Sequence, residues 1–546
     1  MEERKVMKKI AAVLLSLVLV AATCAGCGTK IDPNDPQKLE IYLYNAGYGY
    51  EWCEALLDAF QQEDWVKEKY PDLKVNFEKD ELQTRAQELM SASKKVNKYE
   101  IVMGSSLEGV LTPDSGVENL TESVYNSVVP GEDVLYKDKL IPSFLTSAAY
   151  LDKGAQQNGN DKQYYQINWG SGMTGLVYNE DRLTALGFTV PNTTDELVKI
   201  MQDVKTLGGK NPAYTQTTSL VTYGASAYCM YLYYTWWAQY QTVDEYINFY
   251  NGIDSSTMSR SPEVFRQQGL LKAMEVLEKI MHRDNGLTWL NPSTGREAYR
   301  ETQNRLQRGD GIFMANGDWV DNELASFREG LIKVNGRADT VKMMRTPVIS
   351  DIIERTPSIP DDATLSKVVK AIDEGETSYQ GVTAEDFAAI VAARNVVYSI
   401  GPGHNAYIPS YASGKEVAVD FLRFMATDKA NEIYIRVTNG ASLPFKYDLK
   451  EKNPDLFEQI SPLQQNRLSY FAQMDVNILP SQASFPLVRY GGLSSMKTGS
   501  PLTEFTGGTS KGNYDSVAQM VFEREYKYWT DNNNANWRST LSQAGM

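Results

Sequence analysis

The sequence predicts an α/β fold, because strand-like and helix-like segments alternate along the first part of the chain. Residues 39–44 (LEIYLY) form an apolar run of strand length, and residues 73–77 (LKVNF) alternate like a strand. Between them, residues 51–70 place apolar side chains at helical spacing. A helical pattern over residues 81–94 and a strand-like run at 100–103 (EIVM) follow. This order predicts a parallel sheet covered by helices.

A second unit of the same kind begins near residue 164. Residues 175–178 (GLVY) predict a strand, and residues 180–186 predict a short helix. Thr193 and Glu196 have the spacing of a capping box, which predicts a helix through residue 207.

The alternation continues through the middle of the chain. Helical patterns cover residues 262–282 and 297–307, and residues 311–315 (GIFMA) predict a strand. Residues 406–409 then predict a strand before a helix over residues 415–426.

Two regions depart from this pattern. Residues 347–396 are charged and marked by prolines, with helical pieces, and we interpret the stretch at 350–395 as an insertion on a surface. The last hundred residues are helical and polar without a repeat, and residues 531–536 (DNNNAN) predict a loop.

Composition excludes several classes of partner and cofactor. The 546-residue chain carries a net charge of -15, which argues against nucleic acid or an anionic lipid surface as a partner. The chain has two histidines, His282 and His404, and no HExxH motif or Cys/His cluster, so we expect no metal and no cofactor. The glycines of residues 170–175 match GxGxxG but precede a strand, which argues against a dinucleotide site.

The N-terminal segment has the features of an export signal. Four basic residues precede the apolar run at residues 10–22, which is too short to span a bilayer but suits a signal peptide. Small residues before Cys27 resemble the lipobox of bacterial lipoproteins, in which the cysteine is acylated. We therefore expect a signal peptide at residues 1–26, lipidation of Cys27 and a tether at residues 27–37; an uncleaved anchor is the alternative. Cys53 and Cys229 are expected to be buried free thiols, although a disulfide is chemically permitted outside the cell.

Aromatic residues are abundant, with 33 Tyr and 9 Trp, and several lie at predicted loop positions. Saccharide sites combine flat aromatic side chains with carboxylates and amides, because sugar rings have apolar faces and hydroxyl edges. Most of these aromatic residues must nevertheless be core, and the run from Tyr223 to Tyr240 has the spacing of a packing face. Asp318 and Trp319 follow a predicted strand; Asp318 can simply cap a helix, but ligands also bind at this edge of an α/β sheet.

Three segments resemble the extracellular solute-binding proteins of ABC importers, in the carbohydrate-binding group that includes maltose-binding protein. They are residues 164–197, residues 311–319 (GIFMANGDW) and residues 407–426 (YIPSYASGKEVAVDFLRFMA). The resemblance implies a two-lobed periplasmic-binding-protein-like fold with a ligand cleft between the lobes. The first lobe would comprise residues 38–166 with 400–445, and the second would comprise residues 167–399 with 446–546.

The resemblance also implies a ligand site. Trp319 matches the sugar-stacking position, and Asp318 would bond sugar hydroxyls. The other expected ligand-binding residues lie at strand ends, at the crossing and in the aromatic segment of the second lobe: Tyr48, Ser105, Trp169, Tyr223 and Trp236.

The implied protein is a monomeric, lipid-anchored binding protein on the outer face of a bacterial membrane, not an enzyme. It would capture a sugar or oligosaccharide by lobe closure and deliver it to an ABC permease. Two other functions stay open at this point, namely an anchored carbohydrate-active enzyme and a ligand-sensing partner of a membrane receptor kinase.

Overall fold

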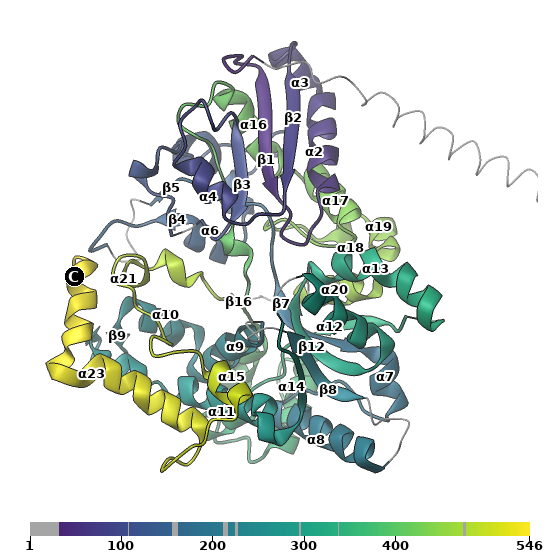
Figure 1. Cartoon of the computed structure of the whole chain (residues 1–546), viewed down its shortest axis with the longest axis vertical. Coiled ribbons are helices and arrows are strands. Elements are labelled where there is room, and N and C mark those ends of the chain that lie inside the picture. The colour runs from purple at the N-terminus through teal and green to yellow at the C-terminus, as the bar shows by residue number, and fades with distance from the viewer. Residues whose placement is uncertain are drawn as a thin grey trace, which may run out of the picture.

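The computed structural model consists of two lobes, each built around a five-stranded sheet (Figure 1). It describes residues 32–107, 109–155, 162–210, 217–223, 228–293, 296–336, 338–472 and 477–546. The predicted signal peptide and Cys27 lie outside the described residues. Within those ranges, no helix is long and apolar enough to cross a membrane.

The sheet of the first lobe has the strand order β2-β1-β3-β15-β6. Strand β1 pairs in parallel with β2 and β3, whereas β15 pairs antiparallel with β3 and with β6. The predicted strands near residues 39, 73, 100 and 406 are confirmed. The strands are β1 (Lys38–Tyr44), β2 (Lys74–Asp80), β3 (Ile101–Ser105), β6 (Ile167–Asn168) and β15 (His404–Tyr407).

Helices pack on both faces of this sheet. The expected single helix over residues 51–70 is two helices, because Glu63 has an extended backbone (φ -63°, ψ 131°) that ends the first. The buried side chains of the first helix include Trp52, Leu56 and Phe60. The helices of this lobe are α2 (Glu51–Gln62), α3 (Asp64–Lys69), α4 (Arg85–Met90), α5 (Tyr136–Lys139), α6 (Pro142–Ala148), α16 (Lys415–Phe424) and α17 (Asp428–Val437).

The sheet of the second lobe has the order β11-β8-β12-β7-β13. Strand β8 pairs in parallel with β11 and β12, whereas β7 pairs antiparallel with β12 and β13. The predicted strands at residues 175–178 and 311–315 are confirmed within β7 and β12. The bounds are β7 (Thr174–Asn179), β8 (Thr218–Tyr223), β11 (Thr288–Asn291), β12 (Gly311–Gly317) and β13 (Val341–Met344).

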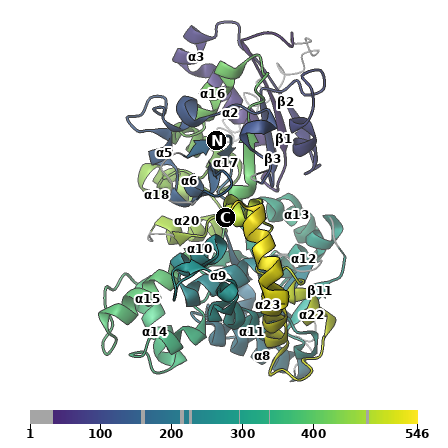
Figure 2. The ribbon, with the colours of Figure 1, turned by 90° about the vertical axis from the view of Figure 1, so that its left-hand side faces the viewer.

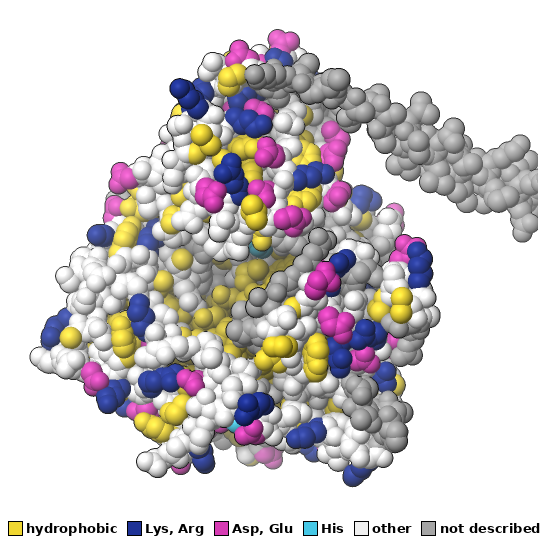
Figure 3. All heavy atoms as spheres, in the orientation of Figure 1, with side chains coloured by type: hydrophobic (Ala, Val, Ile, Leu, Met, Phe, Trp, Pro, Cys, Tyr) yellow, Lys and Arg dark blue, Asp and Glu magenta, His cyan; other side chains and the backbone are white. Residues whose placement is uncertain are grey.

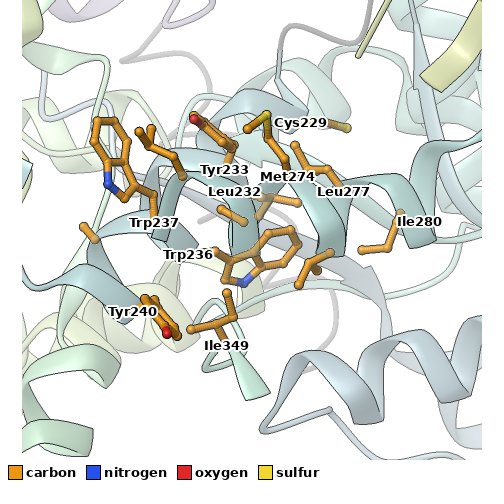
Figure 4. Close-up of a cluster of buried hydrophobic side chains, with 14 of the residues drawn as sticks. Cys229, Leu232, Tyr233, Trp236, Trp237, Tyr240, Met274, Leu277, Ile280 and Ile349 are labelled. Atoms are coloured by element: carbon orange, nitrogen blue, oxygen red, sulfur yellow. The ribbon is translucent and has the colours of Figure 1, made fainter. Parts of the chain in front are cut away.

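A large apolar core lies beneath this second sheet. Trp236 and Trp237 are completely buried in it, next to side chains of α11 and of the segment at Ile349 (Figure 4). The helices that contribute to this core include α7 (Glu180–Ala185), α8 (Thr194–Lys210), α9 (Cys229–Gln241), α10 (Val243–Asn251) and α11 (Gln268–Met281). Helices α12 (Arg296–Arg308) and α13 (Val320–Asn335) contribute Leu306, Val320 and Leu324 to a separate, smaller apolar cluster.

The stretch at residues 350–395 does contain the expected helices, α14 (Asp362–Asp373) and α15 (Ala384–Arg394). It is more than a surface insertion, because Leu365, Val368 and Ile390 are completely buried in the core of the second lobe.

The C-terminal region covers both lobes. Helices α18 (Leu449–Lys452) and α19 (Pro454–Gln459) pack together with Ile435 of α17, and α20 (Pro462–Ala472) packs against β13. Helix α21 spans Pro486–Arg489, and α22 spans Pro501–Gly507. Helix α23 (Val517–Gln543) runs along the second lobe and ends near the boundary between the lobes (Figure 2). The loop expected at residues 531–536 is a kink in α23, where Asn532, Asn533 and Asn534 have left-handed φ values.

Two chain segments cross between the lobes in direct contact. The Thr174 amide donates to the Tyr398 carbonyl oxygen, and the Ile400 amide donates to the Gly172 carbonyl oxygen. A Cβ atom at Gly401 would lie 2.3 Å from the Ser171 carbonyl oxygen, so only glycine fits there. The crossings therefore lie near residues 170 and 400, while the exact lobe boundaries stay a prediction.

Candidate ligand-binding cleft

A cavity of about 750 Å³ lies between the lobes. Figure 3 shows it as a hollow with hydrophobic side chains on its walls. The first lobe contributes the chain after β1 and after β3, and the second lobe contributes the starts of α9 and α13. The crossing segment at residues 398–404 completes the lining. Ligands of α/β proteins bind at this edge, beyond the carboxyl ends of the strands.

Aromatic side chains cover one wall of the cleft. The Tyr231 ring stacks between Tyr228 and Tyr398, with centroid distances of 5.2 Å and 5.4 Å. The Trp319 ring meets Tyr228 edge-on at 6.0 Å. We call Tyr228, Tyr231, Tyr398 and Trp319 the aromatic wall. Such a surface offers flat apolar area with little rotamer freedom to lose, and its tyrosines keep a polar hydroxyl group.

Trp319 occupies the turn between β12 and α13. Its indole lies directly over Gly317, where a Cβ atom would come within 1.9 Å of the ring. Gly47 of the first lobe also lies close to this ring, since a Cβ atom on Gly47 would be 3.0 Å from Trp319 Cδ1. The side chain lines the cleft but is only 3% exposed.

Asp318 links three parts of the chain behind the cleft. Tyr48 of the first lobe donates its hydroxyl to Oδ1 at 3.0 Å, and the Ser171 hydroxyl donates to Oδ2 at 2.7 Å. Arg467 Nη1 lies 3.9 Å from Oδ2. Burial raises the pKa of Asp318, while Arg467 and both hydrogen bonds act in the opposite direction. The carboxylate is therefore already bonded to the protein.

Arg467 is itself completely buried and extends the link to the C-terminal region. Its Nε donates to Gln464 Oε1 at 2.6 Å, and Nη2 donates to the Gly440 carbonyl oxygen at 2.7 Å. Gln464 donates in turn to the carbonyl oxygen of Asp318 at 2.7 Å. This network fixes the start of α13, and with it Trp319.

Three of the glutamates that the structure describes line the cleft. Glu81 accepts hydrogen bonds from Asn45 at 3.0 Å and from the Tyr50 hydroxyl at 2.9 Å, and Glu51 accepts one from the Tyr50 amide at 3.0 Å. We call Glu51 and Glu81, which belong to the first lobe and are exposed, the rim carboxylates. Their unused oxygen lone pairs can accept hydrogen bonds from ligand hydroxyl groups.

Glu323, the third glutamate, belongs to α13 and lies deeper. Gln303 Nε2 donates to its carboxylate at 2.6 Å, and burial raises the pKa of Glu323 to about 7. The neighbouring Asn322 donates to the Gly47 carbonyl oxygen across the lobe boundary at 2.9 Å.

His404 belongs to the floor of the cleft. Its ring stacks on Trp169 with centroids 4.9 Å apart, and Tyr48 meets it edge-on at 5.4 Å. Burial lowers the pKa of His404 to about 4, so the imidazole is neutral at pH 7. Among the described residues, its Nδ1 has no hydrogen-bond partner.

The residues expected at the site fall into three groups. Ser105 and Trp319 line the cleft. Tyr48, Trp169 and Asp318 lie directly behind it, where Trp169 donates its Nε1 hydrogen to the Gly104 carbonyl oxygen at 3.1 Å.

The remaining two expected residues lie elsewhere. Trp236 is in the core of the second lobe, with its Nε1 bonded to the Pro347 carbonyl oxygen at 3.1 Å, so it does not face the cleft. Tyr223 ends β8, and its side chain lies outside the described residues.

Sequence reasoning missed Tyr228, Tyr231 and Tyr398. The first two belong to the aromatic run, and the signal that could have found them is their position at the start of α9, because helix starts face this cleft. Tyr398 lies three residues before the crossing at Gly401, which gives no local sign of its role.

Neither metal chemistry nor a disulfide is visible in the described part of the chain. No group of three or more potential metal ligands occurs there. Cys53 and Cys229 are buried and free, as expected from the sequence, and burial raises the pKa of both thiols.

The sequence matches no protein-family model and no curated protein. Solved structures do match. A probable secreted solute-binding lipoprotein from Streptomyces coelicolor has a TM-score of 0.54 and 13% identity, covering 90% of this chain and 99% of that one. The GacH receptor of Streptomyces glaucescens, solved unliganded and with acarbose, has a TM-score of 0.53 and 13% identity, covering 90% of this chain and 98% of that one. Maltose-bound MalE3 of T. maritima has a TM-score of 0.52 and 15% identity, covering 90% of this chain and 98% of that one. The chain thus has the α/β fold of these two-lobed binding proteins.

Proposed function

We propose that this chain is an extracellular solute-binding protein that captures a saccharide between its lobes and presents it to an ABC permease. Lipidation of Cys27 would hold it at the outer face of the cell membrane, and two or more acyl chains would make that attachment stable. The protein binds its ligand and releases it unchanged.

The observation that carries this proposal is the composition of the interlobe cleft. Its lining combines the aromatic wall with carboxylates, amides and hydroxyls contributed by both lobes. A pyranose ring can place its apolar face on the aromatic side chains and its hydroxyl groups against the polar side chains. The fold also supports the proposal, because structures with this fold include proteins solved with maltose and with acarbose.

The proposed mechanism follows from the fact that both lobes supply residues to the cleft. The rim carboxylates belong to the first lobe, and Trp319, Tyr228 and Glu323 belong to the second. A ligand gains both sets of contacts only when the lobes approach each other, so it shifts an equilibrium toward the closed form. A permease that binds the closed form thereby receives loaded protein.

The test is a melting-temperature screen of the purified chain against neutral, amino-bearing and acidic mono- and oligosaccharides. A ligand at about 100 times its Kd stabilises the folded state by about 2.7 kcal/mol, which raises the melting temperature measurably. Recovery of the saccharide intact after incubation separates binding from hydrolysis. No stabilisation by any saccharide would contradict the proposal, and cleavage of the ligand would replace it with an enzymatic one.

A further inference from the structure

The charge of the cleft points to the class of saccharide. The described residues that line the cleft include Glu51, Glu81 and Glu323, and none of them is lysine or arginine. On the face seen in Figure 3, the Lys and Arg side chains stand on the outer surfaces of the lobes. Carboxylates that face a cavity with low-dielectric walls concentrate a negative potential inside it.

Helix N-termini are the feature that could counter this potential. Helices α2, α9 and α13 begin at the cleft, and each N-terminus carries a partial positive charge of about half a unit. However, α2 has Glu51 and Glu54 in its first turn, and α13 has Asp321 and Glu323. Carboxylates of the chain itself thus stand in the first turns of these two helices, where their negative charge offsets the partial positive charge of the termini.

One described cation beside the rim, Lys79, is already engaged. Lys79 Nζ lies 5.5 Å from the centroid of the Tyr50 ring. Hydrogen bonds from the backbone amides of Glu51 and Tyr50 lower the pKa of Glu51, and the charge of Lys79 adds a smaller effect in the same direction. Lys79 thereby offsets part of the negative charge of one rim carboxylate, that of Glu51. Glu81 and Glu323 have hydrogen-bond partners but no ion pair among the described residues.

We infer that the cleft takes uncharged or amino-bearing saccharides and excludes anionic ones such as uronates, sugar phosphates and sulfated sugars. This inference rests on the proposed function and names the substrate class of the same site. The glutamates accept hydrogen bonds from hydroxyl or ammonium groups, and the tyrosine rings add a favourable surface for a cation. An acidic group in the cleft would have carboxylate neighbours from both lobes.

A ligand-independent measurement tests the charge of the cleft. Ser326 lines the cleft at its exposed edge, so Ser326→Cys places a thiol there. In the full chain with Cys24→Ser and Cys27→Ser, the other thiols, Cys53 and Cys229, are buried. We expect a cationic methanethiosulfonate reagent to react at this thiol about tenfold faster than its anionic counterpart at low ionic strength.

A matched pair of triple variants locates the source of this preference. Glu51→Gln, Glu81→Gln and Glu323→Gln together should bring the two rates close to each other. Glu376→Gln, Glu385→Gln and Glu458→Gln replace the same number of glutamates at exposed positions that do not line the cleft, and should leave the preference intact. Equal rates in the starting protein, or equal losses in both triple variants, would overturn the inference.

A binding screen with oligosaccharides of equal length then tests the substrate class. We expect binding only to neutral or amino-bearing members, with uronate-bearing members bound at least tenfold more weakly. Binding confined to anionic members would overturn this inference and leave the proposed function standing. Absence of binding to every saccharide would overturn the proposed function itself, and the inference with it.

Discussion

At the scale of single residues, Trp319 shows how closely the cleft depends on the backbone around it. Gly317 and Gly47 both lie close to its indole, and the hydrogen bonds of the buried Asp318 fix the residue before it. The ring is therefore held in one orientation before any ligand arrives, which lowers the entropy that binding must overcome.

We expect Trp319→Ala to weaken saccharide binding by about 10- to 100-fold, because an aromatic stacking surface is lost. Titration calorimetry with the best ligand from the saccharide screen measures the change. Trp65→Ala is the control, since Trp65 is half-buried on the first lobe and does not line the cleft. Equal affinity of the native protein and the Trp319→Ala variant would exclude Trp319 from the site.

The raised pKa of Glu323 predicts that the free energy of unfolding depends on pH. Its pKa is about 7 in the folded protein and about 4.3 in an unfolded chain, so the folded state binds the extra proton between these values. The free energy of unfolding should therefore fall as pH rises from about 4.5 to 7, by about 1–3 kcal/mol.

The groups facing Glu323 are Gln303, which is bonded to it, and Gly47 and Tyr44 of the first lobe. Urea unfolding of the native protein and of Glu323→Gln at several pH values isolates this contribution. The variant should lack this part of the decline. Parallel pH profiles for the two proteins would contradict the assignment of the raised pKa to Glu323.

At the scale of elements, the crossing between the lobes is the most constrained part of the fold. Gly172 has a φ of 52°, and a Cβ atom on it would lie 2.3 Å from the Gly401 amide nitrogen. At Gly172 and Gly401, each crossing segment thus leaves no room for a side chain on the other.

Gly401→Ala should lower the free energy of unfolding by about 2 kcal/mol or more, because the new methyl group overlaps backbone atoms of residues 170 and 171. Gly330→Ala is the matched control. That glycine lies inside α13 with nothing within 4 Å of the added Cβ, so alanine should stabilise the protein by about 0.5–1 kcal/mol. Denaturant titration of both variants measures the difference, and a neutral Gly401→Ala would show that the crossing can separate without cost.

Element patterns made most of the fold predictable from the sequence. Apolar runs such as residues 39–44 and 311–315 identify strands because a buried strand is apolar on both faces. The sequence identifies the aromatic run before Tyr240, but of its members expected at the site, Trp236 lies in the core. Tyr228 and Tyr231 lie half-buried at the start of α9 and Trp236 lies in its buried part, and only the packing around the helix separates these two environments.

At the scale of the whole molecule, hydrogen bonds connect the two lobes directly. Tyr48 bonds to Asp318, and Asn322 bonds to the Gly47 carbonyl oxygen. These bonds favour the arrangement in which the lobes touch, and contacts of a bound ligand with both lobes would favour the same arrangement. Sequence patterns cannot show such contacts, since Tyr48 and Asp318 are 270 positions apart.

Tyr48→Phe removes one of these bonds while keeping the ring. We expect the ligand-free variant to shift toward an open form, seen as a larger radius of gyration in small-angle X-ray scattering. Tyr526→Phe removes a comparable bond, to Glu263, within the second lobe and should leave the radius unchanged. A radius identical to that of the native protein for Tyr48→Phe would mean that this bond does not hold the lobes together.

The position of β15 in the sheet of the first lobe also governs how this protein folds. This strand lies between β3 and β6, yet its residues follow those of β3 by about 300 positions. Contacts between such distant segments form slowly, because a long loop must close before they yield any stabilisation. The first lobe therefore cannot complete its sheet until most of the chain has been synthesised. For the exported protein proposed above, such late folding favours passage through a secretion channel, which accepts an unfolded chain.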